Sequence, residues 1–222
     1  MLGQGRFLEV SLPTPDILAS LGFYRALGFT EIPVNDIRAH HYAAVTDGRI
    51  VLGLHGGGYE EPALTFVLRD LGRLVPALAA AGNALAFQQL GDDRFNEAGF
   101  HTPDGQLIAL VEAPTFSASA VAEAGTPAIG SIASVILRSP DPDAAGGWLG
   151  AHGFDAAGDD RWRLGPLTLE LVAGFPVPGP ALRLPALTAA TKTRLDAAGI
   201  APRRRPVGDV LLAPEGTWVV CG

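Results

Sequence analysis

Glu9 is the side chain best placed to do acid–base chemistry. It lies in "RFLEVSLP", which alternates as a half-buried strand does, so its carboxylate is expected on the inward face. A carboxylate on a mostly apolar face has a raised pKa unless it is paired, and such a group can act as a general acid or base. The alternative is that Glu9 pairs with Arg6 or Arg49, or lies at a sheet edge.

Histidines supply a second candidate acid or base. In "HHYAAV", strand alternation sends His40 and Tyr42 to one face and His41 to the other. One of the two histidines is expected to line a pocket, and His41 is the candidate; the alternative is an ordinary surface or core histidine. His55 and His101 are interpreted as residues at strand ends.

Aromatic and amide side chains between residues 85 and 100 could contact a ligand. Small-molecule sites are mostly apolar and contain a few placed polar groups. The candidates for substrate binding are Phe87, Gln89, Phe95, Asn96 and Phe100. For the phenylalanines, the alternative is ordinary core packing.

Composition excludes several classes of protein. Apolar residues make up 48% and charged residues 18% of the 222, which is typical of a compact globular protein. A net charge of −7 argues against nucleic acid or anionic membrane as a partner. The basic run Arg203–Arg205 is interpreted as a solvated loop, with an anion site as the alternative.

Other features point to a cytoplasmic protein. Cys221 is the single cysteine, so no internal disulfide can form, and no long apolar run or export signal is evident. The sequence has no serine elbow, His-Glu-x-x-His motif or dinucleotide fingerprint, and "HGGGYEEP" lacks the ending of a phosphate loop. We expect a monomer or homodimer that binds a small molecule.

The elements that must position these residues repeat along the chain. Residues 6–58 show the order strand, helix, strand, strand, strand, in which Asp16 can cap the helix and Gly28 can end it. Residues 62–114 repeat this order, and Pro76 is expected to make the first turn of their helix irregular or late. Two shorter copies are predicted at about 129–174 and 179–222.

A boundary falls between the two pairs of copies. Residues 115–128 have the small, polar and proline-containing composition of a linker. We therefore predict an α+β protein with one domain at 1–114 and a degenerate second domain at 129–222.

The chain resembles the vicinal oxygen chelate superfamily of glyoxalases, bleomycin-resistance proteins and extradiol dioxygenases. The segments that carry this resemblance are "EVSLPTPDILASLGFYRALGF" at 9–29 and "TPDGQLIALVEA" at 102–113. The resemblance implies four βαβββ modules, paired into two domains, each with a curved sheet around a cavity. It also implies that the first and last strands of the modules can bring four side chains to one divalent metal.

The family's metal positions are mostly apolar in this sequence. By motif, they fall at Glu9, Leu52, Ala63 and Ala109 in the first domain; the second offers Ser134, Glu170 and Val220. Sites of this kind need about three imidazole, thiolate or carboxylate ligands. We therefore expect no metal and no other cofactor, and a cavity at Ala109 that has kept its shape.

The leading hypothesis is that the first domain encloses a small, largely apolar or aromatic molecule without a metal. It would either sequester this molecule or convert it by acid–base chemistry. One alternative is a metal-dependent lyase, isomerase or ring-cleaving dioxygenase with unusual ligands such as His41, Glu9 and Glu170. Another is a structural or regulatory protein whose pocket is filled by its own side chains.

Overall fold

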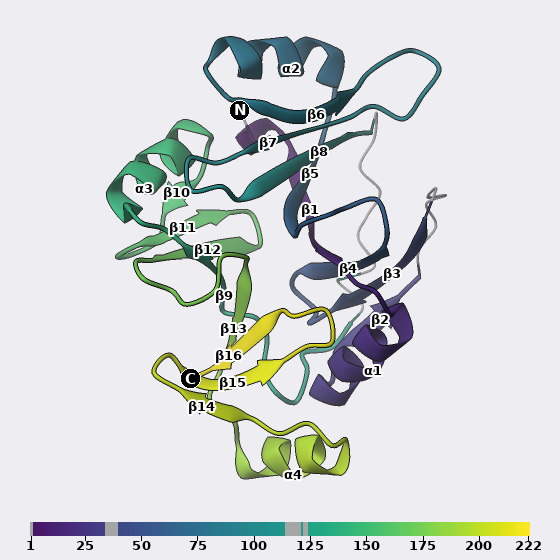
Figure 1. Cartoon of the computed structure of the whole chain (residues 1–222), viewed down its shortest axis with the longest axis vertical. Coiled ribbons are helices and arrows are strands. Elements are labelled where there is room, and N and C mark those ends of the chain that lie inside the picture. Colours follow the sequence, from purple (N-terminus) through teal and green to yellow (C-terminus); the bar gives the residue numbers. More distant parts are fainter. Residues whose placement is uncertain (1, 34–39, 114–120, 122–123) are drawn as a thin grey trace.

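The structure is a computed structural model that describes residues 2–33, 40–113, 121 and 124–222. Within these ranges the chain forms two eight-stranded sheets and four α-helices, and a 3₁₀ turn at Leu2–Gln4 precedes them (Figure 1). The predicted α+β fold of four βαβββ modules is confirmed. Residues 115–120 and 122–123 of the predicted linker lie outside the described residues.

The first sheet is built from two modules. Its strand order is β2-β3-β4-β1-β5-β8-β7-β6, so the antiparallel pair β1–β5 joins the modules at the centre. The first module comprises β1 (Arg6–Pro13), α1 (Ile17–Leu27), β2 (Thr30–Ile32), β3 (His41–Thr46) and β4 (Val51–Gly56). The second comprises β5 (Ala63–Leu68), α2 (Leu71–Ala80), β6 (Leu85–Gln89), β7 (Glu97–His101) and β8 (Leu107–Glu112).

The second sheet repeats this plan. Its order is β10-β11-β12-β9-β13-β16-β15-β14, and β9–β13 is the central antiparallel pair. The third module comprises β9 (Ser134–Arg138), α3 (Pro142–Ala151), β10 (Asp155–Ala156), β11 (Arg161–Leu164) and β12 (Leu167–Val172). The fourth comprises β13 (Ala181–Leu184), α4 (Ala189–Ala197), β14 (Arg203–Arg205), β15 (Gly208–Leu212) and β16 (Trp218–Cys221).

Helix ends follow the predicted capping residues closely in the first module. Asp16 accepts a hydrogen bond from the Ala19 backbone N–H at 3.0 Å, and Gly28 adopts the left-handed conformation at φ 93°. The expectation for Pro76 is wrong, because α2 begins at Leu71 and contains this proline. Proline at the sixth position lacks only one intrahelical N–H, and the helix continues.

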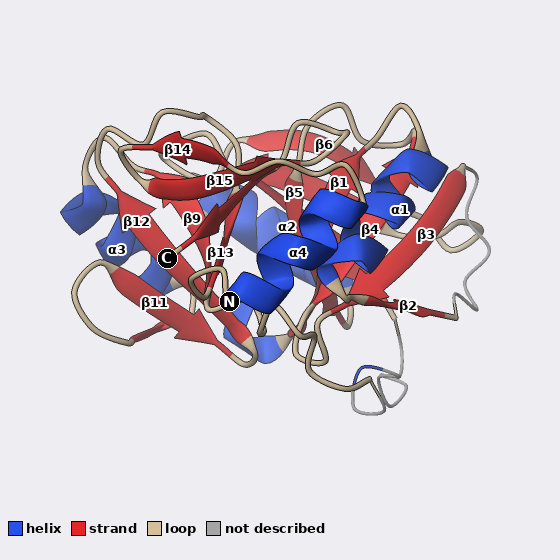
Figure 2. Cartoon of the chain, turned by 90° about the horizontal axis from the view of Figure 1, so that it is seen from below, coloured by secondary structure: helices blue, strands red, loops and turns tan. Residues whose placement is uncertain are grey.

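One hydrophobic core joins both halves of the chain. Phe66 of β5 packs edge-on against Phe154, and Phe100 of β7 packs against Trp148 of α3. Helices α1 and α4 lie side by side (Figures 1 and 2). No helix among the described residues is long and apolar enough to cross a lipid bilayer.

Candidate acid–base site

Glu9 projects from the inner face of the first sheet, which is the face opposite the helices. Val10 and Leu12 of β1 belong to the main hydrophobic core, so alternation turns Glu9 and Ser11 to the other side. The Glu9 side chain is only 1% exposed. The structure therefore places this carboxylate inward, as expected from the sequence.

Side chains of Ser11, His55 and Tyr42 lie within hydrogen-bond distance of this buried carboxylate. Oε1 of Glu9 accepts from Ser11 Oγ at 2.9 Å and from His55 Nε2 at 2.8 Å, and Oε2 accepts from the Tyr42 hydroxyl. Ser11 also lies 2.6 Å from Thr65 Oγ1. Because the groups around it can all donate, the site suits an ionised, acceptor-only carboxylate.

His55 links Glu9 to a second imidazole nearer the surface. Its Nδ1 lies 2.9 Å from His40 Nε2, and its Nε2 faces Glu9. His55 is fully buried, whereas His40 is partly exposed. The rings of Tyr42 and Tyr59 flank His55 with centroids at 4.8 and 4.6 Å. We call this chain of hydrogen bonds from Glu9 through His55 to His40 the relay.

Glycines make room for the relay. A Cβ at Gly53 of β4 would lie 2.4 Å from the Glu9 carboxyl group. A Cβ at Gly58, whose φ is +80°, would lie 2.5 Å from the His40 ring. The glycine at position 58 therefore leaves room for the His40 imidazole.

His41 does not join the site. In register, Tyr42 pairs with His55 and His41 pairs with Gly56, so His41 lies on the opposite face of β3 from the relay. His41 is exposed to solvent. The candidate His41 therefore lies on the other side of β3 from Glu9, because the strand directs His40 and Tyr42 to the inner side instead.

Two of the five candidate ligand contacts, Phe87 and Gln89, lie on the inner face, because their register partners Gly99 and Glu97 pair with Ala109 and Val111 of β8. Phe87 covers Gly99, where a Cβ would lie 2.3 Å from its ring. Phe100 is wholly buried against Trp148 on the other face. Asn96 donates to Glu112 at 2.6 Å and accepts from the Gly91 backbone N–H at 2.7 Å, so it holds a turn.

The remaining two candidates are exposed. The Gln89 amide donates weakly to the Phe95 carbonyl at 3.4 Å, and Phe95 is 60% exposed. Both lie at the end of the β6–β7 hairpin. The structure therefore does not gather the five residues into one binding surface.

The expected cavity over Ala109 is filled by the chain itself. Ala63, Leu107 and Ala109 form a small buried cluster, against which Tyr59 and Phe87 pack. Ala109 is 1% exposed. An open hollow at this position is therefore a wrong expectation, and the accessible side of the site is the partly exposed end at His40 and Tyr42.

One of the inferred metal positions needs correction. Leu52 pairs with Val10, and both face the core. Gly53 pairs with Ser11 of the first strand of its module. In the second module, Ala109 pairs in the same way with Thr65. Gly53 is therefore the counterpart of Ala109. The first-domain positions become Glu9, Gly53, Ala63 and Ala109.

In the second domain, Glu170 occupies the position that corresponds to Gly53, because it pairs with Ile136 of the central strand β9. It accepts from Ser134 at 2.7 Å and from two nitrogens of Arg183 at 2.6 and 2.8 Å. Burial alone would raise the pKa of Glu170, but the hydrogen bonds from Arg183 and Ser134 and the charges of Arg183 and Arg161 lower it below its ordinary value.

These residues do not fit a metal of the superfamily type. Among the described residues, no group of three or more His, Cys, Asp or Glu side chains is arranged to hold an ion. Glu9 and His55 are hydrogen-bonded to each other, and Glu170 holds a guanidinium. The alternative ligand set fails as well, since Glu9 and Glu170 belong to different sheets and His41 faces away from Glu9.

His55 is the member of this candidate site that the sequence interpretation missed. It does lie near the end of its strand, as predicted, but it is buried and touches Glu9. Alternation in "IVLGLH" contains the signal, since Leu52 and Leu54 on one face leave Gly53 and His55 on the other. The parallel register of β1 with β4 pairs His55 with Pro13, on the same face as Glu9, whose side chain reaches His55 across Gly53.

Solved structures similar to this chain include ring-cleaving dioxygenases and a glyoxalase. A catechol 2,3-dioxygenase has 12% identity and a TM-score of 0.60 over 98% of this chain and 87% of its own. Homoprotocatechuate 2,3-dioxygenase from Arthrobacter globiformis has 13% identity and a TM-score of 0.61 over 98% and 79%. The Mn(II)-bound glyoxalase from Novosphingobium aromaticivorans has 19% identity and a TM-score of 0.58 over 98% and 82%.

The sequence matches no protein-family model and no curated protein. At these identities the structural likeness defines the fold. The chain has the tandem two-domain fold of the vicinal oxygen chelate superfamily.

Proposed function

We propose that the first domain is a metal-independent acid–base site for a small aromatic or phenolic molecule. The observation that supports this function is the relay, in which a buried carboxylate orients a buried imidazole toward a partly exposed one. A carboxylate in this position fixes the ring and stabilises the cation that forms when the imidazole pair takes a proton.

The site would act at its open end. A ligand next to His40 meets Tyr42 and Tyr59, whose rings suit an aromatic partner. A phenol that gives its proton to His40 becomes a phenolate, and the added positive charge is balanced by Glu9. Catechols are natural probes because two of the structural neighbours are named for acting on them.

The test uses 4-nitrocatechol, whose visible absorption moves to longer wavelength when it loses a proton. We expect saturable binding with this shift in the wild type, and a weakening of about tenfold in His40→Asn and Glu9→Gln. His41→Asn is the matched control, since this neighbouring histidine faces away from the relay. It should bind as the wild type does.

Two results would contradict the proposal: equal weakening in His41→Asn and His40→Asn, or no shift in the wild type at any concentration. The second would favour the structural alternative, in which Tyr59 and Phe87 simply fill the fold. Because Glu9→Gln disturbs a buried group, the comparison of the two histidine variants decides the result if that variant does not fold.

A further inference from the structure

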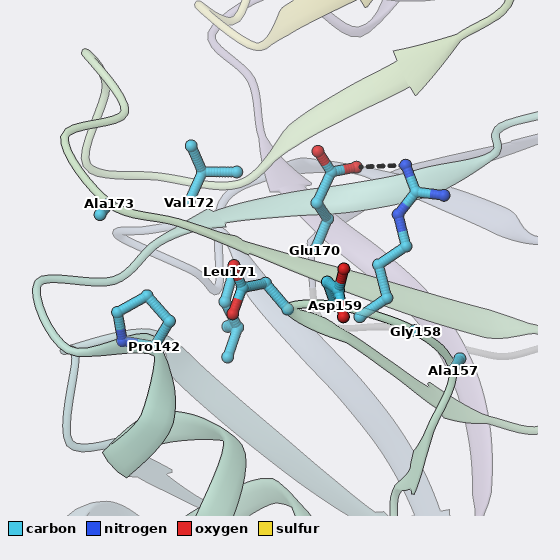
Figure 3. A pocket seen from close by; sticks show the side chains of 10 residues that line it. Pro142, Ala157, Gly158, Asp159, Glu170, Leu171, Val172 and Ala173 are labelled. Atoms are coloured by element: carbon cyan, nitrogen blue, oxygen red, sulfur yellow. Dashed lines mark hydrogen bonds and ion pairs between the residues drawn. The ribbon is translucent and has the colours of Figure 1, made fainter.

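The inner face of the second sheet carries a concentration of arginines. Residues that pair in register point to the same face, and Glu170 pairs with both Ile136 and Arg161. By the same registers, the side chains that share this face with Glu170 include Arg138, Arg161, Arg163 and Arg183. Glu170 and Val172 project from one side of β12, away from the helix that begins at Pro142 (Figure 3).

The first domain contributes another arginine to this face. Arg49, in the turn between β3 and β4, donates to the Ile132 carbonyl at 3.4 Å and to Thr168 Oγ1 at 3.3 Å. Thr168 alternates with Glu170 along β12, so it also lies on the inner side. We call these five residues the arginine face: Arg49, Arg138, Arg161, Arg163 and Arg183.

Carboxylates offset only part of this charge. Arg183 binds the Glu170 carboxylate through two nitrogens. Arg161 makes one longer contact with it, at 3.3 Å. Asp155 pairs in register with Arg163, but among the described residues neither Arg163 nor Arg138 forms an ion pair. A positive excess therefore remains in a chain whose net charge is −7.

A pocket of about 470 Å³ opens beside the arginine face. Arg161 and Glu170 line it together with Pro142 and residues 171–173, and the turn at 157–160 closes its other side (Figure 3). This turn brings Asp159 and Asp160, both exposed, to the pocket. Arg161 is the arginine that lines the pocket, and Arg163 lies outside it on the same face of β11, so the two aspartates favour an anion on the β11 side, away from the turn.

We propose that the arginine face binds the carboxylate or phosphate group of a small molecule. A guanidinium offers a planar fork of donors that matches either group, and Arg161 is 47% exposed, which leaves donors beyond its single long contact with Glu170. Arg183, fixed by two hydrogen bonds to Glu170, adds a stationary positive charge on the same face. Arg161 and Arg163 are the residues that contact the anion.

The test is a titration followed by two-dimensional amide NMR of the whole chain. The probes are benzoate, phenyl phosphate, inorganic phosphate and, as a neutral comparison, benzyl alcohol. We expect at least one anion to shift amides of β11 and β12 saturably, and benzyl alcohol to leave them unchanged. The double variant Arg161→Gln/Arg163→Gln should weaken that binding about tenfold.

The matched control is Arg204→Gln. Arg204 is an exposed arginine that pairs with Asp209, and it lies outside the arginine face. Its variant should bind within about twofold of the wild type. Equal weakening by Arg204→Gln, equal binding of benzyl alcohol, or no saturable shift with any anion would overturn the proposal. Preference among the three anions identifies the group as a carboxylate, an organic phosphate or free phosphate.

Discussion

At the scale of single residues, the inner face of the first domain is filled by side chains of the chain itself. Glu9 occupies the space over Gly53, and Tyr59 and Phe87 cover Ala63 and Ala109. A small residue at one ligand position thus accommodates a larger side chain from elsewhere. Any methyl group restored at Gly53 would have to displace the Glu9 carboxylate.

Gly53→Ala should therefore destabilise the protein by about 2 kcal/mol, through overpacking against a group held by three hydrogen bonds. The measurement is urea unfolding of wild type and variant. Gly72→Ala is the control, because a Cβ there meets nothing within 4 Å and alanine favours a helix. A Gly53→Ala protein as stable as Gly72→Ala would contradict the packing described for Glu9.

At the scale of elements, local signals predicted the modules well. Alternation of apolar residues predicted the first strand, and the capping residues Asp16 and Gly28 predicted the ends of the first helix. These signals act between neighbours in the sequence, so they can be read without the structure. The place of His55 depends instead on the register between β1 and β4, which local periodicity does not supply. The filling of the cavity by Tyr59 also depends on a distant contact, so it could not be predicted.

The two aspartates before α1 and α2 provide a test at this scale. Asp16 caps α1 with its side chain, whereas Asp70 has φ 56° and makes no such bond. Asp16→Ala should cost about 1 kcal/mol of unfolding free energy. Asp70→Gly should stabilise the protein by about 0.5 kcal/mol, because glycine adopts the left-handed conformation without strain. Thermal and urea unfolding measure both changes. The free energy of unfolding must fall in Asp16→Ala and rise in Asp70→Gly for the prediction to hold.

At the scale of the whole molecule, the number of modules followed from the repeat, but the contacts between the two halves of the chain did not. Asp47 accepts from the Ile132 backbone N–H at 2.6 Å, and Gly3 donates to the His152 carbonyl at 3.1 Å. These pairs join residues far apart in sequence, where no local pattern is informative. With a shared core, they favour unfolding of the two domains as one unit.

Glu215 is the strongest test of this coupling. From the turn before β16 it accepts from Tyr24 at 2.6 Å and from Ser20 at 2.7 Å, both on α1 of the other domain. Burial, and then the nearby Glu215, raise the pKa of the Tyr24 hydroxyl well above its ordinary value. Glu215→Ala would leave a buried hydroxyl without its carboxyl acceptor, at a cost of about 2 kcal/mol.

Adding Tyr24→Phe removes that stranded hydroxyl, so the double variant should be less destabilised than the sum of the single variants. Glu31→Ala, which breaks only the exposed pair between Glu31 of β2 and Arg25 of α1, should change stability by less than about 0.5 kcal/mol. Urea unfolding followed by tryptophan fluorescence measures the wild type, the two single variants at Glu215 and Tyr24, the double variant and Glu31→Ala. Additive losses, or a Glu215→Ala value no larger than that of Glu31→Ala, would show that this carboxyl group does not couple the domains.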